Sequence, residues 1–252
     1  PFTYHSKIKI KIGDIVEVPF GSKHEIGVIW KNIYQEPKNI KIKEISKKTD
    51  YSIDKKLVNF IEWFSIYNMV PIGLVLKMVI GSVDKFVKKN DHSIKLRETK
   101  SLKYVLSKEQ ESALKFLEKT KNKFEVSVLQ GTTGSGKTLV YFERIKKIIK
   151  EKKQALVLLP EIFLTNDFKL RFEDFFGFEP AIWHSKITPK QKRIIWKGII
   201  GNKIKILIGA RSALLLPFKK LGIIIVDEEH DTSYKQDEGV IYNARDMAIS
   251  RA

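Results

Sequence analysis

Residues 131–138 read Gly131-Thr132-Thr133-Gly134-Ser135-Gly136-Lys137-Thr138, which fits the P-loop pattern G-x-x-x-x-G-K-[ST]. The apolar residues 126–129 before it are expected to form a short buried strand, and residues 136–150 after it a helix. In such a unit the glycines let backbone N–H groups surround phosphate oxygens, and the helix N-terminus adds its dipole. The stretch therefore predicts an ATP site, in which Lys137 reaches the β- and γ-phosphates and Thr138 ligates Mg²⁺.

A second motif, Asp227-Glu228-Glu229-His230, directly follows the apolar residues 223–226. An acid at the carboxyl end of a parallel strand lies at the crevice where ligands bind. We expect Asp227 to hold Mg²⁺ and Glu228 to orient and deprotonate the attacking water. An isolated acidic cluster is more often a solvated turn. Following a P-loop in this order, it indicates the second half of an ATP-hydrolysing site.

The second part of the chain alternates predicted strands and helices. Residues 155–159, 204–208 and 222–226 are apolar without alternation, and a further helix is predicted over residues 163–176. This pattern is typical of a parallel sheet covered on both faces, and so of an α/β fold.

The first part is predicted to be a small, mostly β (α+β) domain. Residues 7–12 alternate isoleucine with lysine, which indicates a half-buried strand. After the turn signal Gly13-Asp14, residues 15–18 form a strand that should break at residues 19–21, and another should start at residue 27.

Helical periodicity then replaces the alternation. An apolar helical face is formed by Leu57, Phe60, Ile61, Phe64 and Tyr67. We expect Pro71 to end that helix and residues 72–79 to form a second apolar segment. The charged residues 85–103 are interpreted as a linker, with a domain boundary near residue 95. The predicted domains are residues 1–95 and 96–252.

Composition narrows the functional class. Of 252 residues, 47 are Lys or Arg and 29 Asp or Glu, a net charge of +18 that favours a polyanion such as nucleic acid as partner. No cysteine is present, which excludes a disulfide, a cysteine-ligated zinc and a thiol nucleophile within the chain. No apolar run reaches the roughly 18 residues of a membrane span. The Pro1 start and the helical character of residues 244–252 suggest a fragment.

The P-loop followed by D-E-E-H resembles superfamily 2 helicases, whose motor has two RecA-like lobes. The family of replication-restart DNA helicases typified by primosomal protein N′ (PriA) is similar from about residue 104 to the end. The similarity is carried by Leu159–Thr165, His184-Ser185, Arg193, Trp196, Gly209–Leu214, Pro217-Phe218, Ser233–Gln236, Glu238-Gly239, Tyr242 and Ala244–Asp246.

The resemblance implies roles for individual residues. Gln110 matches an adenine-reading glutamine, although a solvated glutamine is an equal alternative. His230 is expected to couple the nucleotide and DNA sites rather than form a surface pair. Arg211 fits a phosphate contact to single-stranded DNA, with a structural salt bridge as the alternative. Tyr234, with Tyr242, is expected in an aromatic loop that senses DNA, whereas Trp183 and Trp196 are expected in the core.

The amino-terminal stretch resembles the same family's 3′-DNA-end-binding domain. The matching residues are Phe2-Thr3-Tyr4, Gly13-Asp14, Val16, Val18–Gly21, Ile26-Gly27, Tyr67 and Pro71–Gly73. Phe2 is then expected to stack on the terminal base beside Tyr4, and Gly21 to allow close approach of the backbone. Lys43, or equally Lys41, would contact the adjacent phosphate. The family typically has an acid where this chain has Thr3; a threonine makes a weaker bond to a 3′-hydroxyl. The alternative is a frayed terminus.

The function implied by the resemblance is ATP-driven 3′-to-5′ DNA unwinding at abandoned replication forks, with primosome loading. Expected partners are forked and single-stranded DNA, single-stranded-DNA-binding protein and other primosome proteins. We expect a cytoplasmic monomer that does not bind membranes. Zinc is implied for the full-length family, with an arginine finger in a second lobe, but this chain holds no zinc ligands of that kind. A winged-helix domain between the two parts is expected to be absent.

Two alternatives remain open. One is another superfamily 2 motor, such as an RNA helicase or a restriction translocase, which would lack the end-binding part. The other is a DNA-end-binding adaptor whose P-loop only senses nucleotide. A preference for forked DNA over RNA would distinguish the replication-restart helicase from the first alternative. ATP binding without turnover in the full-length protein would support the second.

Overall fold

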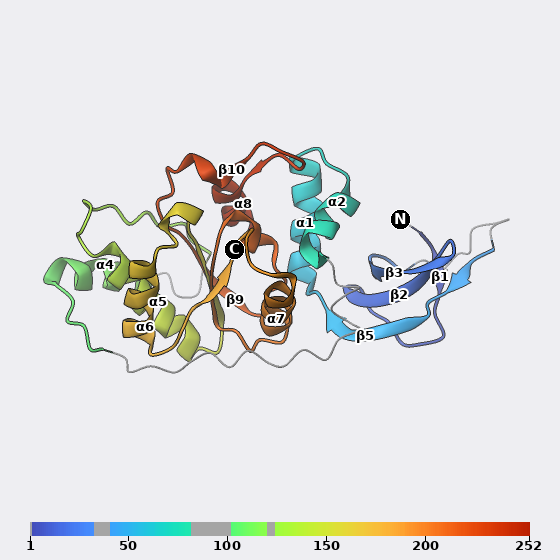
Figure 1. Ribbon diagram of the computed structural model, residues 1–252, viewed down its shortest axis with the longest axis horizontal. Coiled ribbons are helices and arrows are strands. Elements are labelled where there is room, and N and C mark those ends of the chain that lie inside the picture. The colour runs from blue at the N-terminus through green and yellow to red at the C-terminus, as the bar shows by residue number, and fades with distance from the viewer. Residues whose placement is uncertain (1, 33–40, 82–101, 120–123) are drawn as a thin grey trace. The chain divides into compact units, whose positions relative to one another are not determined.

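The computed structural model describes residues 2–32, 41–81, 102–119 and 124–252 (Figure 1). The chain divides into two compact units, Pro1–His92 and Ser93–Ala252. Most of the predicted linker, including the expected boundary near residue 95 and the room for a winged helix, lies outside the described residues. Within the described ranges, no helix has the length and apolar character needed to cross a membrane.

The first unit has a three-stranded antiparallel sheet in the order β3-β2-β5, made of β2 (Asp14–Phe20), β3 (Lys23–Val28) and β5 (Lys47–Ser52). A short strand β1 (Tyr4–His5) pairs in parallel with β4 (Lys43–Glu44). Two helices follow, α1 (Lys55–Tyr67) and α2 (Ile72–Ile80). The first buries Leu57, Phe60, Ile61 and Phe64 as predicted, whereas Tyr67 is exposed and stacks on Trp63.

Two predictions for this unit are wrong. Residues 7–12 form no strand, and Ile8 and Ile12 are exposed. Both edges of β2 are taken by β3 and β5, so the segment finds no place beside that strand, and the chain turns at Gly13 (φ 90°) into β2.

The strand break falls at Gly21-Ser22, after Pro19, and β3 starts at Lys23 rather than at residue 27. Pro19 is tolerated in β2 because β5 pairs only with residues 14–17 of that strand, so the proline lies where one side is unpaired.

The second unit has a four-stranded sheet in the order β7-β8-β6-β9, and every pair in it is parallel. The strands are β6 (Gln154–Leu158), β7 (Ala181–Trp183), β8 (Ile206–Gly209) and β9 (Leu221–Val226). The helices are α4 (Lys108–Glu118), α5 (Lys137–Lys150), α6 (Asn166–Phe176), α7 (Pro189–Ile200) and α8 (Ala244–Arg251). The predicted α/β class with a parallel sheet is confirmed.

Short elements connect these strands and helices at the carboxyl end of the sheet. They are the 3₁₀ turns η1 (Glu161–Phe163), η2 (Arg211–Leu215) and η3 (Thr232–Tyr234), and the two-residue strands β10 (Lys235–Gln236) and β11 (Tyr242–Asn243). The core between α5, α6 and the sheet is rich in aromatic rings, with Phe142 and Phe172 fully buried. Trp196 is buried as predicted, and Trp183 is half-buried and donates to the Ser212 hydroxyl (3.1 Å).

Two predictions for the second unit are corrected. Residues 126–129 are not a buried strand: Val128 is 87% exposed, and the described part of the sheet, which ends at β7 and β9, does not pair with them. The helix predicted over residues 163–176 starts at Asn166, because the Thr165 hydroxyl accepts from the Phe168 N–H (3.2 Å) and caps it there.

Candidate functional site

The P-loop runs between the exposed segment 124–130 and the first turn of α5. Gly134 and Gly136 have φ values of 80° and 79°, which glycine adopts readily. A Cβ on Gly131 would lie 2.7 Å from the Ser135 hydroxyl oxygen, so the serine side chain would have to move. Residues 131–135 are exposed, so phosphate oxygens can reach their backbone N–H groups. These features favour a phosphate-binding loop at the start of α5, although the strand predicted before it is not part of the described sheet.

Lys137, the first residue of α5, folds back over the loop. Its ammonium donates to the carbonyl oxygens of Gly131 (2.7 Å) and Thr132 (3.1 Å). The positive charge is thus held at the loop, next to the helix N-terminus, where a phosphate is attracted.

Gln110 lies against this loop. Its carbonyl oxygen accepts from the Ser107 N–H (2.9 Å) in the capping box of α4, and its amide nitrogen donates to the Ser135 carbonyl (2.9 Å). A side chain on Gly136 would collide with the Gln110 amide. The structure therefore brings Gln110 to the nucleotide-binding loop, and adenine reading by this residue stays a prediction.

Asp227 comes directly after β9, and its backbone N–H donates to the Leu158 carbonyl at the end of β6 (3.1 Å). Its two carboxylate oxygens have different partners. Oδ1 accepts from the Glu228 N–H (3.0 Å), and Oδ2 accepts from the hydroxyl of Tyr141 on α5 (2.8 Å). The two predicted motifs therefore meet, since Tyr141 lies one turn after Thr138.

Sequence reasoning missed Tyr141, which lies in the helix predicted over residues 136–150 and received no role there. Burial, the charge of Asp227 and the hydrogen bond to it raise the pKa of this phenol well above its usual range. A tyrosine three residues after the P-loop threonine was the available signal.

The other acids of the motif are more open. Glu228 has a φ of 48°, a left-handed conformation that costs a non-glycine residue energy and is found at functional sites. The His230 ring nitrogen Nε2 lies 3.8 Å from the Glu228 carboxylate, and the imidazole is exposed. This is a loose surface pair, so the coupling role of His230 stays a prediction.

The donor set fits Mg²⁺ with a nucleotide. Magnesium in such sites is bound by one or two protein oxygens together with phosphates and water. Thr138 supplies a hydroxyl and Asp227 a carboxylate, and Tyr141, one turn after Thr138 on α5, donates to that carboxylate. Across the described residues no group of three or more His, Cys, Asp or Glu could hold a metal by itself. The protein's share of the ligands is therefore small, as expected where phosphates complete the shell.

Tyr234, which is expected in an aromatic loop that senses DNA, is buried in this structure. The side chain is 2% exposed, and its hydroxyl donates to the carbonyls of Leu158 (2.9 Å) and Asp227 (2.6 Å). The ring cannot stack on a base from this position; it supports the ends of β6 and β9. Tyr242 is buried as well, and burial raises its pKa to about 12.

Arg211 starts η2 and holds the loop that contains Tyr234. One guanidinium nitrogen donates to the carbonyls of Ser233 (3.0 Å) and Lys235 (2.6 Å). Both acceptors are backbone carbonyls and not carboxylates, so these two hydrogen bonds are not the structural salt bridge considered as the alternative. The phosphate contact stays a prediction for this residue.

Another link at the carboxyl end of the sheet joins η1 to the turn after β7. The Glu161 carboxylate accepts from the N–H (3.2 Å) and hydroxyl (3.0 Å) of Ser185. Burial alone would raise the pKa of Glu161, but these bonds and the charges of His184 and Lys186 hold it below its ordinary value. Lys192 donates to the Ser185 carbonyl (3.2 Å), so the turn is fixed from two sides.

The predicted DNA-end residues of the first unit do come together. Tyr4 pairs with Lys43 across β1 and β4, and the Lys43 ammonium lies 3.5 Å from the Gly21 carbonyl. The Tyr4 hydroxyl donates to the Pro19 carbonyl (3.2 Å). Phe2 is 74% exposed, with its ring edge-on to Phe20 at 5.0 Å between centroids. Thr3 is exposed between the two aromatic residues. These contacts argue against a frayed terminus.

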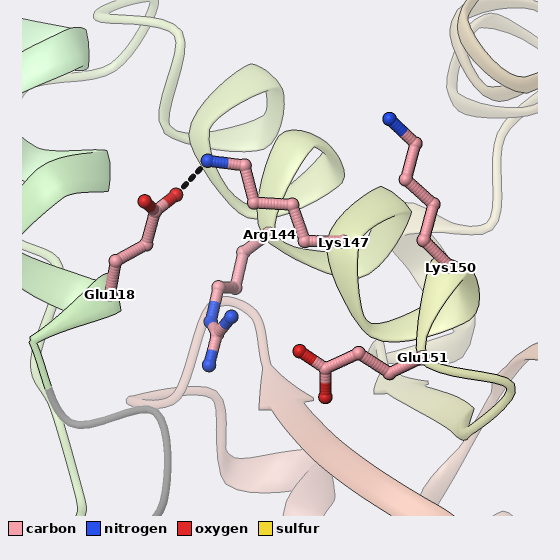
Figure 2. A pocket seen from close by; sticks show the side chains of 5 residues that line it. All are labelled: Glu118, Arg144, Lys147, Lys150 and Glu151. Carbon is pink, nitrogen blue, oxygen red and sulfur yellow. Dashed lines mark hydrogen bonds and ion pairs between the residues drawn. The ribbon is translucent and has the colours of Figure 1, made fainter.

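A hollow of about 250 Å³ lies elsewhere, between the end of α4 and the C-terminal half of α5 (Figure 2). It is lined by Glu118, Arg144, Lys147, Lys150 and Glu151, and Lys147 forms an ion pair with Glu118. None of these residues belongs to the P-loop or to the D-E-E-H motif. The hollow is therefore not the nucleotide site.

A P-loop at the start of a helix, joined to an acid after a parallel strand, defines a nucleotide-dependent motor lobe. Residues 107–250 match the DEAD/DEAH box helicase family, and the chain belongs to this family. Residues 1–81 match the 3′DNA-binding domain (3′BD). This confirms the superfamily 2 resemblance and the end-binding resemblance of the first part. Membership implies ATP binding by the second unit and DNA binding by the first.

The particular relatives are replication restart proteins PriA. The protein from Rickettsia felis is 42% identical over 248 residues, which are 96% of this chain and 37% of the relative. That from Helicobacter pylori (strain 26695) is 35% identical over 249 residues, 99% of this chain and 38% of the relative. The protein from Bacillus subtilis is 35% identical over 224 residues, which are 87% of this chain and 26% of the relative. The chain thus spans between about a quarter and little more than a third of the length of these relatives.

Proposed function

We propose that this chain supplies the DNA-end-binding and ATP-binding parts of an ATP-dependent 3′-to-5′ DNA helicase that acts in replication restart. The observation that carries the proposal is the contact between α5 and Asp227, which joins the P-loop to the acid motif (2.8 Å from Tyr141 to Asp227). The match of residues 1–81 to a 3′DNA-binding domain supports a DNA substrate over the RNA helicase alternative.

Roles follow from the chemistry of each side chain. Lys137 and the N–H groups of residues 131–136 bind the ATP phosphates, and Gln110 holds or reads the nucleotide at the loop. Thr138 and Asp227 bind Mg²⁺, which when bound neutralises charge on the phosphates. Glu228 orients the attacking water and accepts its proton, and His230 couples this site to DNA.

In the first unit, Phe2 and Tyr4 hold a 3′-terminal nucleotide, Thr3 bonds its hydroxyl, and Lys43 contacts the next phosphate. The proposed partners are forked and single-stranded DNA, single-stranded-DNA-binding protein and other primosome proteins. We propose that the protein works as a monomer in the cytoplasm.

The test compares two variants in nucleotide binding and hydrolysis. Lys137→Ala removes the cation at the loop, so Mg-ATP binding should be lost. Glu228→Gln keeps the loop and should bind Mg-ATP normally while hydrolysis in the full-length protein is lost. The 252-residue chain alone is expected to bind Mg-ATP but to turn it over roughly 10³-fold or more slowly than a full-length relative, because the resemblance puts an arginine finger in a second lobe.

Three results would contradict the proposal. One is equal loss of binding in both variants, and another is turnover by the chain alone at the rate of a full-length relative. The third is tighter binding to RNA than to a DNA fork with a 3′-hydroxyl leading strand, which would favour the RNA helicase alternative. ATP binding without hydrolysis by the full-length protein would instead support the nucleotide-sensing adaptor.

A further inference from the structure

The Tyr141 hydroxyl holds one of the two residues expected to bind the metal ion. It donates to Asp227 Oδ2 at 2.8 Å, and Tyr141 lies on α5 one turn after Thr138, the other of these residues. The ring is buried on α5 within the aromatic core, with its centroid 5.2 Å from that of Phe142. A rigid side chain anchored in the core thus ties the Asp227 carboxylate to the helix that carries Thr138.

The second carboxylate oxygen of Asp227 is held separately. Oδ1 accepts from the Glu228 N–H (3.0 Å), so each oxygen of the carboxylate has a fixed donor. A carboxylate oxygen has two lone pairs, so Oδ2 can accept from Tyr141 and still face a metal or its water.

We propose that Tyr141 is a positioning residue for the metal site, whose hydroxyl fixes the carboxylate of Asp227 and its spacing from Thr138. This inference rests on the proposed function, since it needs a metal–nucleotide complex at the P-loop. Mg²⁺ demands near-ideal octahedral geometry at about 2.0–2.1 Å, whereas Ca²⁺ accepts longer and irregular coordination. Fixed spacing should therefore favour Mg²⁺ over Ca²⁺.

The test is Tyr141→Phe, which removes one hydroxyl and keeps the ring. Binding of a fluorescent ATP analogue to the chain is measured while MgCl₂ or CaCl₂ is titrated, with EDTA as the metal-free baseline. We expect the half-saturating Mg²⁺ concentration to rise roughly tenfold, the scale of one hydrogen bond to a charged group. The Ca²⁺ value should rise less than about threefold and metal-free binding should not change, so selectivity for Mg²⁺ falls.

Tyr234→Phe is the matched control. It removes a buried hydroxyl that contacts the Asp227 backbone carbonyl rather than the carboxylate (2.6 Å). It should lower the thermal midpoint but leave the Mg²⁺ to Ca²⁺ ratio unchanged. Equal shifts in both variants would show that Tyr141 only stabilises the end of β9, and would overturn the inference.

The remaining outcomes are also decisive. An unchanged Mg²⁺ dependence in Tyr141→Phe, beside normal binding by the parent chain, contradicts the inference and leaves the proposed function standing. Failure of the parent chain to bind nucleotide contradicts both. A Tyr141→Phe chain whose circular dichroism shows it unfolded would mean that the hydroxyl serves the fold, and the inference would fall.

Discussion

Gln154, the first residue of β6, is a buried amide whose four hydrogen bonds all go to backbone groups. Its nitrogen donates to the carbonyls of Ile199 (3.1 Å) and Ile204 (2.8 Å), and its oxygen accepts from the N–H groups of Lys219 (2.9 Å) and Lys220 (3.0 Å). One side chain therefore joins the end of α7, the approach to β8 and the approach to β9. Gln154→Leu keeps nearly the same volume and removes all four bonds.

The expected cost follows from the groups left behind. A buried backbone group without a partner costs about 1–3 kcal/mol. The Ile199 carbonyl keeps the Asn202 N–H as a donor (3.0 Å), so three backbone groups lose their partner. At the low end of that range, which allows for local relaxation, the loss is about 3 kcal/mol. Domains are stable by about 5–15 kcal/mol, so the second unit should remain folded at neutral pH but become markedly weaker.

Urea unfolding of the parent and variant chains measures this loss. Trp183 and Trp196 report on the second unit by fluorescence, and Trp30 and Trp63 on the first. With a slope of about 2 kcal/mol per molar urea, the midpoint of the second unit should fall by about 1.5 M.

Gln191→Leu is the control for this measurement, because it removes an exposed capping amide that accepts from the Thr188 N–H (2.9 Å). Loss of such a cap costs about 1 kcal/mol. If Gln154→Leu costs no more than this control, the three backbone groups that lose their partner find others, and the reasoning is wrong.

Three further predictions address the surface and the pH response. Lys43→Ala should lower the slope of log K against log[salt] for fork binding by about 0.7–0.9, one phosphate contact, and an unchanged slope would exclude that contact. Thr3→Asp should strengthen discrimination of a 3′-hydroxyl from a 3′-phosphate end by about 1 kcal/mol, measured with two forks that differ only in that group, and no effect would place Thr3 outside the pocket. Burial raises the pKa of Tyr242 to about 12 from about 10, so its contribution is complete below about pH 10 and is lost as the pH rises to about 12. Tyr242→Phe should therefore lose less stability between those pH values than the parent chain in thermal unfolding, and equal losses would refute this assignment.

The sequence predicted correctly those helices and strands whose apolar face packs against a neighbouring element in the structure. The helical face of α1 and the apolar strands β6 and β9 were located within two residues. The strands predicted from the alternation at residues 7–12 and from the apolar stretch 126–129 are absent. A hydrophobic pattern indicates that a segment favours burial, but it does not show that a neighbouring strand is available to pair with it. The P-loop and Asp227 were predictable because each motif carries its own backbone geometry.

Side-chain roles were harder to predict where they depend on contacts distant in sequence. The resemblance implies a DNA-sensing loop around Tyr234, yet the Tyr234 hydroxyl reaches the Leu158 carbonyl, 76 residues away. Tyr141 received no role within the predicted helix, and its contact is with Asp227, 86 residues away. Local composition contains no information on either contact, since both arise only once β9 lies beside β6.

The position of α5 links the core to the chemistry. Its first residues, Lys137 and Thr138, belong to the proposed phosphate and metal sites, while Phe142, four residues after Thr138, is fully buried against rings of α6. Residues four apart share one face of a helix, so a shift that repacks Phe142 also moves Thr138 relative to Asp227. The aromatic packing beneath α5 therefore influences the distance between the two residues proposed to bind the metal, and a core substitution there should change metal dependence as well as stability.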